Sequence, residues 1–330
     1  MIWRPKHERH DPLSVGPRLS LKVYWAALKA SFVQVADNNL ALISAGVAFF
    51  SMLSLFPALA ALIALLSLIS NPAVVLSQLE DIRGLLPDDV YEILNAQVIT
   101  LVTTRADTLG WAGLVSIMVA LWSARAGTGA MMVGLNAVYN QRNRSATRHY
   151  FRALVLTIGL VAVAIVAMLM VVVAPVVLSF LPIGSWTYKV AEAVRWFIAL
   201  SVVFLGIGAI YRFGPNRRPA RTQWLTPGAV VAVVSWTIVS VAFSYYVANF
   251  GNYNQVYGSI GAVIAMLIWL WLTSFLILYG AALNAQLELR TKPDSTVGAP
   301  KPPGQRGAFV ADTIVPVEEE ETPEKVEETR

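Results

Sequence analysis

The sequence predicts an all-α integral membrane protein. We expect a six-transmembrane-helix bundle, with an amphipathic N-terminal interfacial helix and a helical first periplasmic loop. Of the 330 residues, 56% are hydrophobic and only 14% are charged, against about 45–50% and 25% in soluble domains. The chain also contains six long apolar runs, and its Lys and Arg residues gather in every second loop between them, as they do in bacterial membrane proteins.

The six apolar runs are each long enough to cross a bilayer. A helix needs about 20 apolar residues to span about 30 Å of hydrocarbon. The runs are approximately Leu40–Ile69, Leu109–Val138, Phe151–Leu181, Ala193–Phe213, Leu225–Phe250 and Gly258–Leu287. Each run is continuous, which excludes the alternating strands of an outer-membrane barrel. Six buried helices of this length would be exceptional in a soluble protein.

The segments on either side of the runs complete the domain organisation. Residues 1–39 are expected to form a cytoplasmic tail in which apolar side chains recur at helical spacing over Leu19–Val35, which indicates an interfacial amphipathic helix. The side chains of Asp37, Asn38 and Asn39 are expected to cap the first span. Residues 40–290 form the membrane domain, and Pro87 is expected to open a helix in its first loop.

The end of the chain has a different composition. Residues 291–330 are rich in Pro and Glu, and such sequence buries too little apolar surface to fold alone. We expect a disordered acidic cytoplasmic tail. Removal of Thr296–Arg330 is therefore expected to leave insertion and folding unchanged.

The basic residues predict the orientation. They are frequent before the first run (Arg4, Lys6, Arg9, Arg18, Lys22 and Lys29), in the second loop (Arg142, Arg144, Arg148 and Arg152) and in the fourth loop (Arg212, Arg217, Arg218 and Arg221). Arg290 and Lys292 follow directly after the sixth run. The intervening loops contain only Arg83, Arg105 and Lys189. This alternation predicts cytoplasmic N- and C-termini. It also explains the excess of Lys and Arg over Asp and Glu without a nucleic-acid partner, because the positive charges lie in separate loops where they can meet anionic headgroups.

Three motifs resemble those of a known family. They read ISAGVAFFSMLSLFPAL at Ile43–Leu59, LWSARAGTGAMMVGLNAVYN at Leu121–Asn140, and a longer stretch over Phe243–Glu288 that contains Tyr-Gly-Ser and a closing Gly-x-x-x-Asn. Together they resemble the YihY/BrkB family of bacterial inner-membrane proteins, once labelled ribonuclease BN, over about residues 20–290. The resemblance implies six helices with both ends in the cytoplasm.

The resemblance implies less about activity. It links the chain loosely to envelope integrity, virulence and the movement of lipid or lipopolysaccharide precursors. Ribonuclease chemistry requires a metal cluster or a positioned general base, whereas the chain has no Cys and only His7, His10 and His149. We therefore expect a protein without enzymatic activity or cofactor that transports or flips an anionic lipid. The alternative is a scaffold for envelope assembly, and a homo-oligomer remains open in either case.

Arg125 is the main candidate for a functional residue. It lies within the second apolar run, where a charge costs at least about 2.5–3.5 kcal/mol and normally faces a wet cavity or a partner. It could bind an anionic headgroup, or it could form a structural pair with an acid or with carbonyl groups. A third possibility is a helix break near Gly127 and Gly129 that makes its position shallower.

Polar residues near the ends of other runs are further cavity candidates: Asn136, Tyr139, Tyr245, Asn249, Tyr257 and Asn284. Most of them could equally join helices by hydrogen bonds or form an aromatic belt. A structural role is expected for Pro57, Gly258, Gly261 and Gly280. Glu192 is expected to pair with Arg195 on one helix face, and Glu288 to be an interfacial charge beside Arg290.

Overall fold

The computed structural model describes residues 20–69, 106–170, 185–217, 226–249, 259–290, 296, 299 and 301–313. Their regular elements are the helices α1 (Leu21–Asp37), α2 (Leu40–Ile69), α5 (Ala106–Val138), α6 (Ala146–Met168), α8 (Ser185–Phe213), α9 (Pro227–Asn249), α11 (Ser259–Glu288) and α12 (Phe309–Asp312). This part of the chain contains no β-strand, and the all-α prediction is confirmed. The helix expected after Pro87 lies outside the described residues.

Six of these helices are long and apolar enough to cross a membrane: α2, α5, α6, α8, α9 and α11. They coincide with the six predicted runs, so the chain is a multi-pass membrane protein with six candidate spans. Three helices begin earlier than predicted. α5 starts at Ala106, α6 at Ala146 and α8 at Ser185, because a helix continues through polar residues such as Arg148 and Lys189 as long as its backbone hydrogen bonds persist.

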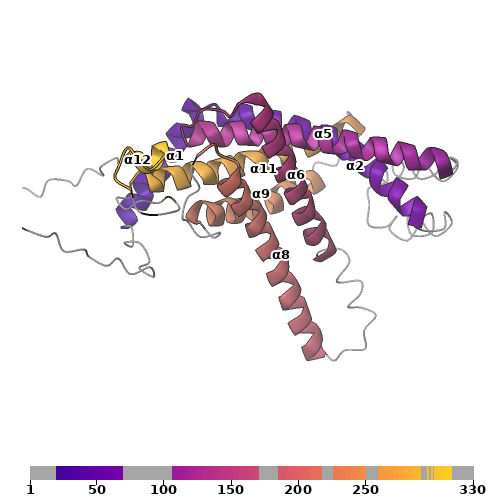
Figure 1. Cartoon of the computed structure of the whole chain (residues 1–330). Helices are drawn as coiled ribbons and strands as arrows, with labels where there is room; N and C mark the ends of the chain where they lie inside the picture. The colour runs from indigo at the N-terminus through magenta and orange to yellow at the C-terminus, as the bar shows by residue number, and fades with distance from the viewer. Residues whose placement is uncertain are drawn as a thin grey trace, which may run out of the picture.

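The helices form two groups (Figure 1). α2, α5, α9 and α11 lie alongside one another, and α2 packs closely on α5. α6 and α8 pair with each other and project away from the other helices, crosswise to α5. The two helices expose large apolar side chains such as Val155, Ile158 and Phe197. In a spanning helix these side chains face lipid, which is as apolar as they are.

The densest packing lies where the ends of several helices converge. The buried cluster there draws on α2, α5, α8, α9, α11 and α12 and includes Leu40, Leu135, Val138, Tyr139, Ile210, Tyr211, Ala229, Leu278, Ala281 and Val310. Gly228 of α9 and Gly280 of α11 meet backbone to backbone, since a Cβ built on either would overlap the carbonyl oxygen of the other. Small residues therefore let these two helices approach closely, and the structural role expected for Gly280 follows from this contact.

α1 precedes the spans as predicted. The side-chain oxygen of Ser20 caps it by accepting a hydrogen bond from the backbone N–H of Val23 at 3.4 Å. Ala27 and Ser31 are buried where α1 packs on α11. Trp25 and Phe32 are largely exposed, and the ring of Phe32 lies 5.1 Å from that of Tyr279 on α11. The turn that follows differs from the expected cap of α2. Asn39 adopts a left-handed φ of 50°, and the side chain of Asn38 donates instead to the carbonyl of Ala137 at 3.3 Å.

A folded segment occurs within the region expected to be a disordered tail. Residues 301–313 turn back on themselves and end in α12. The carboxylate of Asp312 accepts hydrogen bonds from the backbone N–H groups of Gly304, Arg306 and Gly307. Val310 of α12 is buried against the helix ends described above. The composition indicated disorder because only a few apolar residues lie in this segment, among Pro and Gly. The segment is nevertheless folded, because these apolar residues pack against the membrane domain.

Candidate functional site

One end of the bundle carries several of the described basic residues, and we call it the basic end. It comprises the loop 139–145, the residues 214–217 after α8, the start of α9 and the end of α11. The side chains of Arg144 and Arg217 both reach across it to distant segments. In Arg144 the two terminal nitrogens donate to the carbonyls of Gly214 at 2.8 Å and Pro215 at 2.6 Å. Burial, and then the charge of Arg152, lower the pKa of Arg144.

Asn136 connects three segments at the basic end. It is 1% exposed. Its side-chain nitrogen donates to Oδ1 of Asn143 at 2.8 Å, and its side-chain oxygen accepts from the backbone N–H of Asn216 at 2.6 Å. α5 is thereby joined to both basic loops. The side chain of Asn136, which was predicted as a cavity candidate, therefore forms hydrogen bonds within the fold.

Tyr139 lies beneath an ion pair. The guanidinium of Arg217 donates to both carboxylate oxygens of Glu288, at 2.7 Å each, and stands 4.8 Å from the centre of the Tyr139 ring. Burial raises the pKa of Tyr139. Glu288 was expected to lie beside Arg290 as an interfacial charge, but its partner is Arg217, which approaches from the loop after α8.

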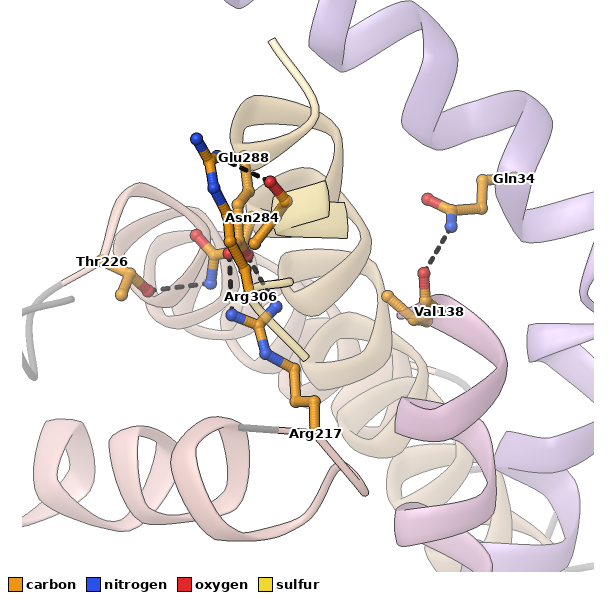
Figure 2. Close-up of polar contacts among 8 residues, drawn as sticks. Gln34, Val138, Arg217, Thr226, Asn284, Glu288 and Arg306 are labelled. Carbon is orange, nitrogen blue, oxygen red and sulfur yellow. Dashed lines mark hydrogen bonds and ion pairs between the residues drawn. The ribbon is translucent and has the colours of Figure 1, made fainter. Parts of the chain in front are cut away.

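Asn284 caps the start of α9. Its side-chain oxygen accepts from the N–H of Gly228 at 2.8 Å, and its nitrogen donates to Oγ1 of Thr226 at 2.9 Å. Figure 2 shows Asn284 facing Thr226 and the guanidinium of Arg217 directed at Glu288. Backbone N–H groups in the first turn of a helix lack partners within the helix, and Asn284 satisfies one of them.

Arg125 lies between α5 and α6. α5 runs unbroken through Gly127 and Gly129, so the proposed helix break is wrong. The guanidinium carbon lies 4.2 Å from the centre of the Tyr150 ring near the start of α6. Nε of Arg125 is buried without a hydrogen bond to any described residue. In the described part of the chain, no acid forms an ion pair with it.

His149 adjoins this position on α6. Its Nδ1 is also buried without a partner among the described residues. A Cβ built on Gly129 would lie 3.2 Å from its Nε2, so the absence of a side chain at Gly129 leaves space for the ring. The two Thr residues nearby form a hydrogen bond between α5 and α6, from Oγ1 of Thr157 to Oγ1 of Thr128 at 2.8 Å.

The remaining candidates that the structure describes lie on other helices than Arg125. Tyr245 lies on α9 toward the end opposite the basic end and is 73% exposed. Asn249 is the last residue of α9, and Gly261 lies in the first turn of α11. Pro57 lies inside α2. Tyr257 and Gly258 lie outside the described residues, so the predicted polar cluster around them is not described.

A cavity and a groove lie along α6. The cavity, of about 480 Å³, is lined by Asn143, Arg144, Ser145, Thr147, Arg148, Phe151, Arg152 and Asn216. The groove, of about 490 Å³, runs between α6 and α8 and is lined by Phe151, Arg152, Val155, Leu156, Gly159, Leu160, Val163, Ala209 and Phe213. Phe151 and Arg152 belong to both. A basic polar space therefore adjoins an apolar one.

Comparison with known proteins decides the family. The family model described as Virulence factor BrkB matches residues 31–305, which include every candidate span and the basic end. The chain belongs to the BrkB family.

Two relatives show how far the similarity extends. A protein of Bacillus subtilis strain 168, named YfkH and described as ribonuclease-like, is 33% identical over 260 residues, which are 76% of this chain and 91% of that protein. A UPF0761 membrane protein of Xanthomonas campestris is 32% identical over 114 residues, which are 34% of this chain and 26% of that protein. No solved structure matches the chain.

Several residues at these sites escape prediction from the sequence. The sequence assigned Arg148 and Arg152 to a loop whose charges indicated only orientation, whereas both lie in the first turns of α6. The ion pair between Arg217 and Glu288 joins residues 71 positions apart, and no local pattern reveals such a partner. In contrast, the expected local pair of Glu192 and Arg195 is confirmed. The part of the chain that the structure describes holds no group of three or more His, Asp or Glu residues arranged to bind a metal ion.

Proposed function

We propose that this member of the BrkB family moves an anionic lipid or lipid-like envelope component across the bacterial inner membrane, and that Arg125 binds its anionic group. The observation that supports the proposal is that the charged side chain of Arg125 has an aromatic neighbour but no described acidic partner. Tyr150 holds one face of the guanidinium, Nε is buried and unbonded, and no described acid neutralises the charge.

The energetics favour an anion as the missing partner. A charged side chain within a span costs at least about 2.5–3.5 kcal/mol, and a cation–π contact returns about 0.5–2 kcal/mol of that. A guanidinium presents its N–H groups as a planar fork that fits phosphate and carboxylate in a bidentate way. The phosphate or carboxylate of a lipid would offset the remaining cost only while it is bound, which is the behaviour required of a transport site.

The orientation forms part of the proposal. The positive-inside rule assigns the basic end and both termini to the cytoplasm. Arg125 contacts Tyr150 in the first turns of α6, so it lies nearer to the cytoplasmic leaflet than its central place in α5 suggests. A lipid from that leaflet could reach it without crossing the centre of the bilayer first.

A scaffold function is the second candidate, and one observation favours it. The side chains of Asn136, Tyr139 and Asn284 are buried in or bonded to the fold at the basic end, which gives a rigid surface suited to assembling partners. The relative from Bacillus subtilis is described as ribonuclease-like. For this chain we propose that it is not an enzyme and requires no cofactor.

The test is a flipping assay in proteoliposomes of phosphatidylcholine and phosphatidylglycerol. Phosphatidylglycerol with a fluorescent label is followed by its loss of accessibility to a membrane-impermeant quencher. Arg125→Lys and Arg125→Ala should each slow flipping at least about tenfold while the melting temperature changes little. Arg142→Gln, which removes an exposed charge from the basic end, is the control and should flip at the wild-type rate.

The same variants discriminate between the two candidates. If Arg125 is only a structural residue, Arg125→Ala should lower the melting temperature and leave flipping unaffected in the protein that remains folded. Wild-type protein that does not accelerate flipping over empty liposomes would contradict the transport proposal and leave the scaffold.

A further inference from the structure

The cavity at the start of α6 and the groove below it together form an amphipathic space. Arg144, Arg148 and Arg152 line the cavity, and no acidic residue is among its eight lining residues. Arg144 is already bonded to Gly214 and Pro215. Arg148 and Arg152 are exposed and make no hydrogen bond or ion pair with any described residue, so their charges are free to bind an anion.

The groove is apolar and lies along α6, which runs away from the other helices (Figure 1). Apart from Arg152, its lining consists of Phe, Val, Leu, Ala and Gly side chains from α6 and α8. At 1.5 Å per residue, the stretch of α6 from Val155 to Val163 measures about 12 Å. Half of a bilayer's hydrocarbon core is about 15 Å thick, so the groove matches the depth that one acyl chain occupies in one leaflet.

We propose that this space binds an anionic phospholipid of the surrounding leaflet. The phosphate lies between Arg148 and Arg152, and one acyl chain lies in the groove between α6 and α8. Charge complementarity selects the occupant: a neutral lipid fits the groove but gains nothing from the two free guanidinium groups. Basic pockets between helix ends are known sites for anionic headgroups. The inference rests on the proposed function, for which this site supplies the lipid.

The site is distinct from Arg125. Tyr150 and His149, which adjoin Arg125, do not line the cavity, whereas Arg148 and Arg152 do. The two positions lie on different faces of α6. The lipid site therefore serves as a docking position on the α8 side of α6, and Arg125 acts on the α5 side. Binding at one can be measured while the other is disabled.

Gly159 provides a specific way to block the groove. It lines the groove, and a Cβ built on it meets no atom within 4 Å, so a larger side chain would fill the space without a clash. Gly46 of α2 is the matched control, because a Cβ built there also meets nothing within 4 Å although it lies far along the chain from α6.

The experiment is a titration of the full-length protein in detergent with phosphatidylglycerol, phosphatidylcholine or glycerol 3-phosphate, with bound molecules counted by native mass spectrometry. Wild type should prefer phosphatidylglycerol. Arg148→Gln combined with Arg152→Gln should weaken that binding about thirtyfold, since each basic residue near a headgroup contributes about a factor of five. Gly159→Leu should weaken binding of both lipids, whereas Gly46→Leu and Arg142→Gln should leave it unchanged.

Three outcomes would overturn the inference. Equal loss of binding with Arg142→Gln would mean diffuse attraction by the whole basic end. Tight binding of glycerol 3-phosphate that depends on Arg148 and Arg152 would mean a site for a soluble phosphate. Unchanged binding with Gly159→Leu would mean that no chain enters the groove. Arg125→Ala should bind phosphatidylglycerol as wild type does while flipping fails, so the inference and the proposed function can fail separately.

Discussion

Arg217 and Glu288 form a bidentate ion pair that fastens the end of α11 to the loop after α8, with both nitrogen–oxygen distances at 2.7 Å. Their side chains are only 4% and 10% exposed. Because Tyr139 lies under the guanidinium, the pair also contacts the end of α5. Three helices that are distant in the sequence thus meet at one buried pair of charges.

Removal of either member of this pair should destabilise the protein. Arg217→Met removes the bidentate guanidinium from the buried Glu288 carboxylate, and Glu288→Leu removes the carboxylate from the guanidinium. Loss of one partner from a buried pair costs about 3–5 kcal/mol, so each variant should lower the melting temperature in detergent clearly. The double variant Arg217→Met with Glu288→Leu leaves no stranded charge and should recover most of the loss.

Arg142→Gln is the control for these variants, since Arg142 is an exposed basic residue of the same end and surface charges contribute little. A double variant as unstable as the sum of the two single variants would show that the two residues act independently and would contradict the pairing.

The fold could be predicted from the sequence because its signals are local. Each span is a continuous apolar run, and the family motifs lie within those runs. The partners of polar side chains depend on tertiary contacts instead. Asn136 and Asn284 were candidates for a cavity, but Asn136 bonds to Asn143 and Asn216, and Asn284 to Thr226 and Gly228. A sequence shows that a polar residue lies in a span without showing what it faces.

Arg125 illustrates the same limit. Its place in the sequence predicted a charge that needs compensation, and the structure supplies an aromatic partner, Tyr150, from the next helix. Neither the contact nor the position of Arg148 and Arg152 around a common cavity follows from spacing along the chain, because both depend on the angle at which α6 crosses α5.

The contact between α9 and α11 should tolerate no added side chain. A Cβ on Gly280 would overlap the carbonyl oxygen of Gly228 and lie 2.9 Å from Cβ of Ala232. Overpacking of this kind typically costs about 1–3 kcal/mol. Gly280→Ala should therefore lower the melting temperature. Gly46→Ala, with open space around it, should leave the melting temperature unchanged or raise it slightly, because Ala favours a helix more than Gly does. Equal effects would contradict the close approach.

Single-cysteine labelling can test the orientation, because the chain contains no native Cys. Labels at Arg142 should react only from the cytoplasmic side and labels at Lys189 only from the opposite side, as the positive-inside rule requires. Both positions are exposed, which makes them better sites than the buried Arg217. Reaction of both from the same side of intact cells would overturn the assigned topology.

The folded segment at residues 301–313 changes what truncation of the chain should do. Composition alone predicted that removal of Thr296–Arg330 would leave folding intact. Val310 is 2% exposed and packs in the same cluster as Leu135, Val138 and Tyr139. Removal of the segment would expose the apolar ends of α5 and α11.

Two truncations and one point variant separate these cases. Removal of residues 314–330 should leave the melting temperature unchanged. Removal of residues 301–330 should lower it, since burial of a single Val side chain is worth about 1.5–3 kcal/mol and Ala311 is buried as well. Val310→Asp in the full-length chain should reproduce most of the loss, because a carboxylate cannot enter the apolar cluster without a partner, while Phe309→Asp, at a 44% exposed position, should not. If both truncations melted at the wild-type temperature, the segment would contribute nothing to stability and the original expectation of a dispensable tail would hold.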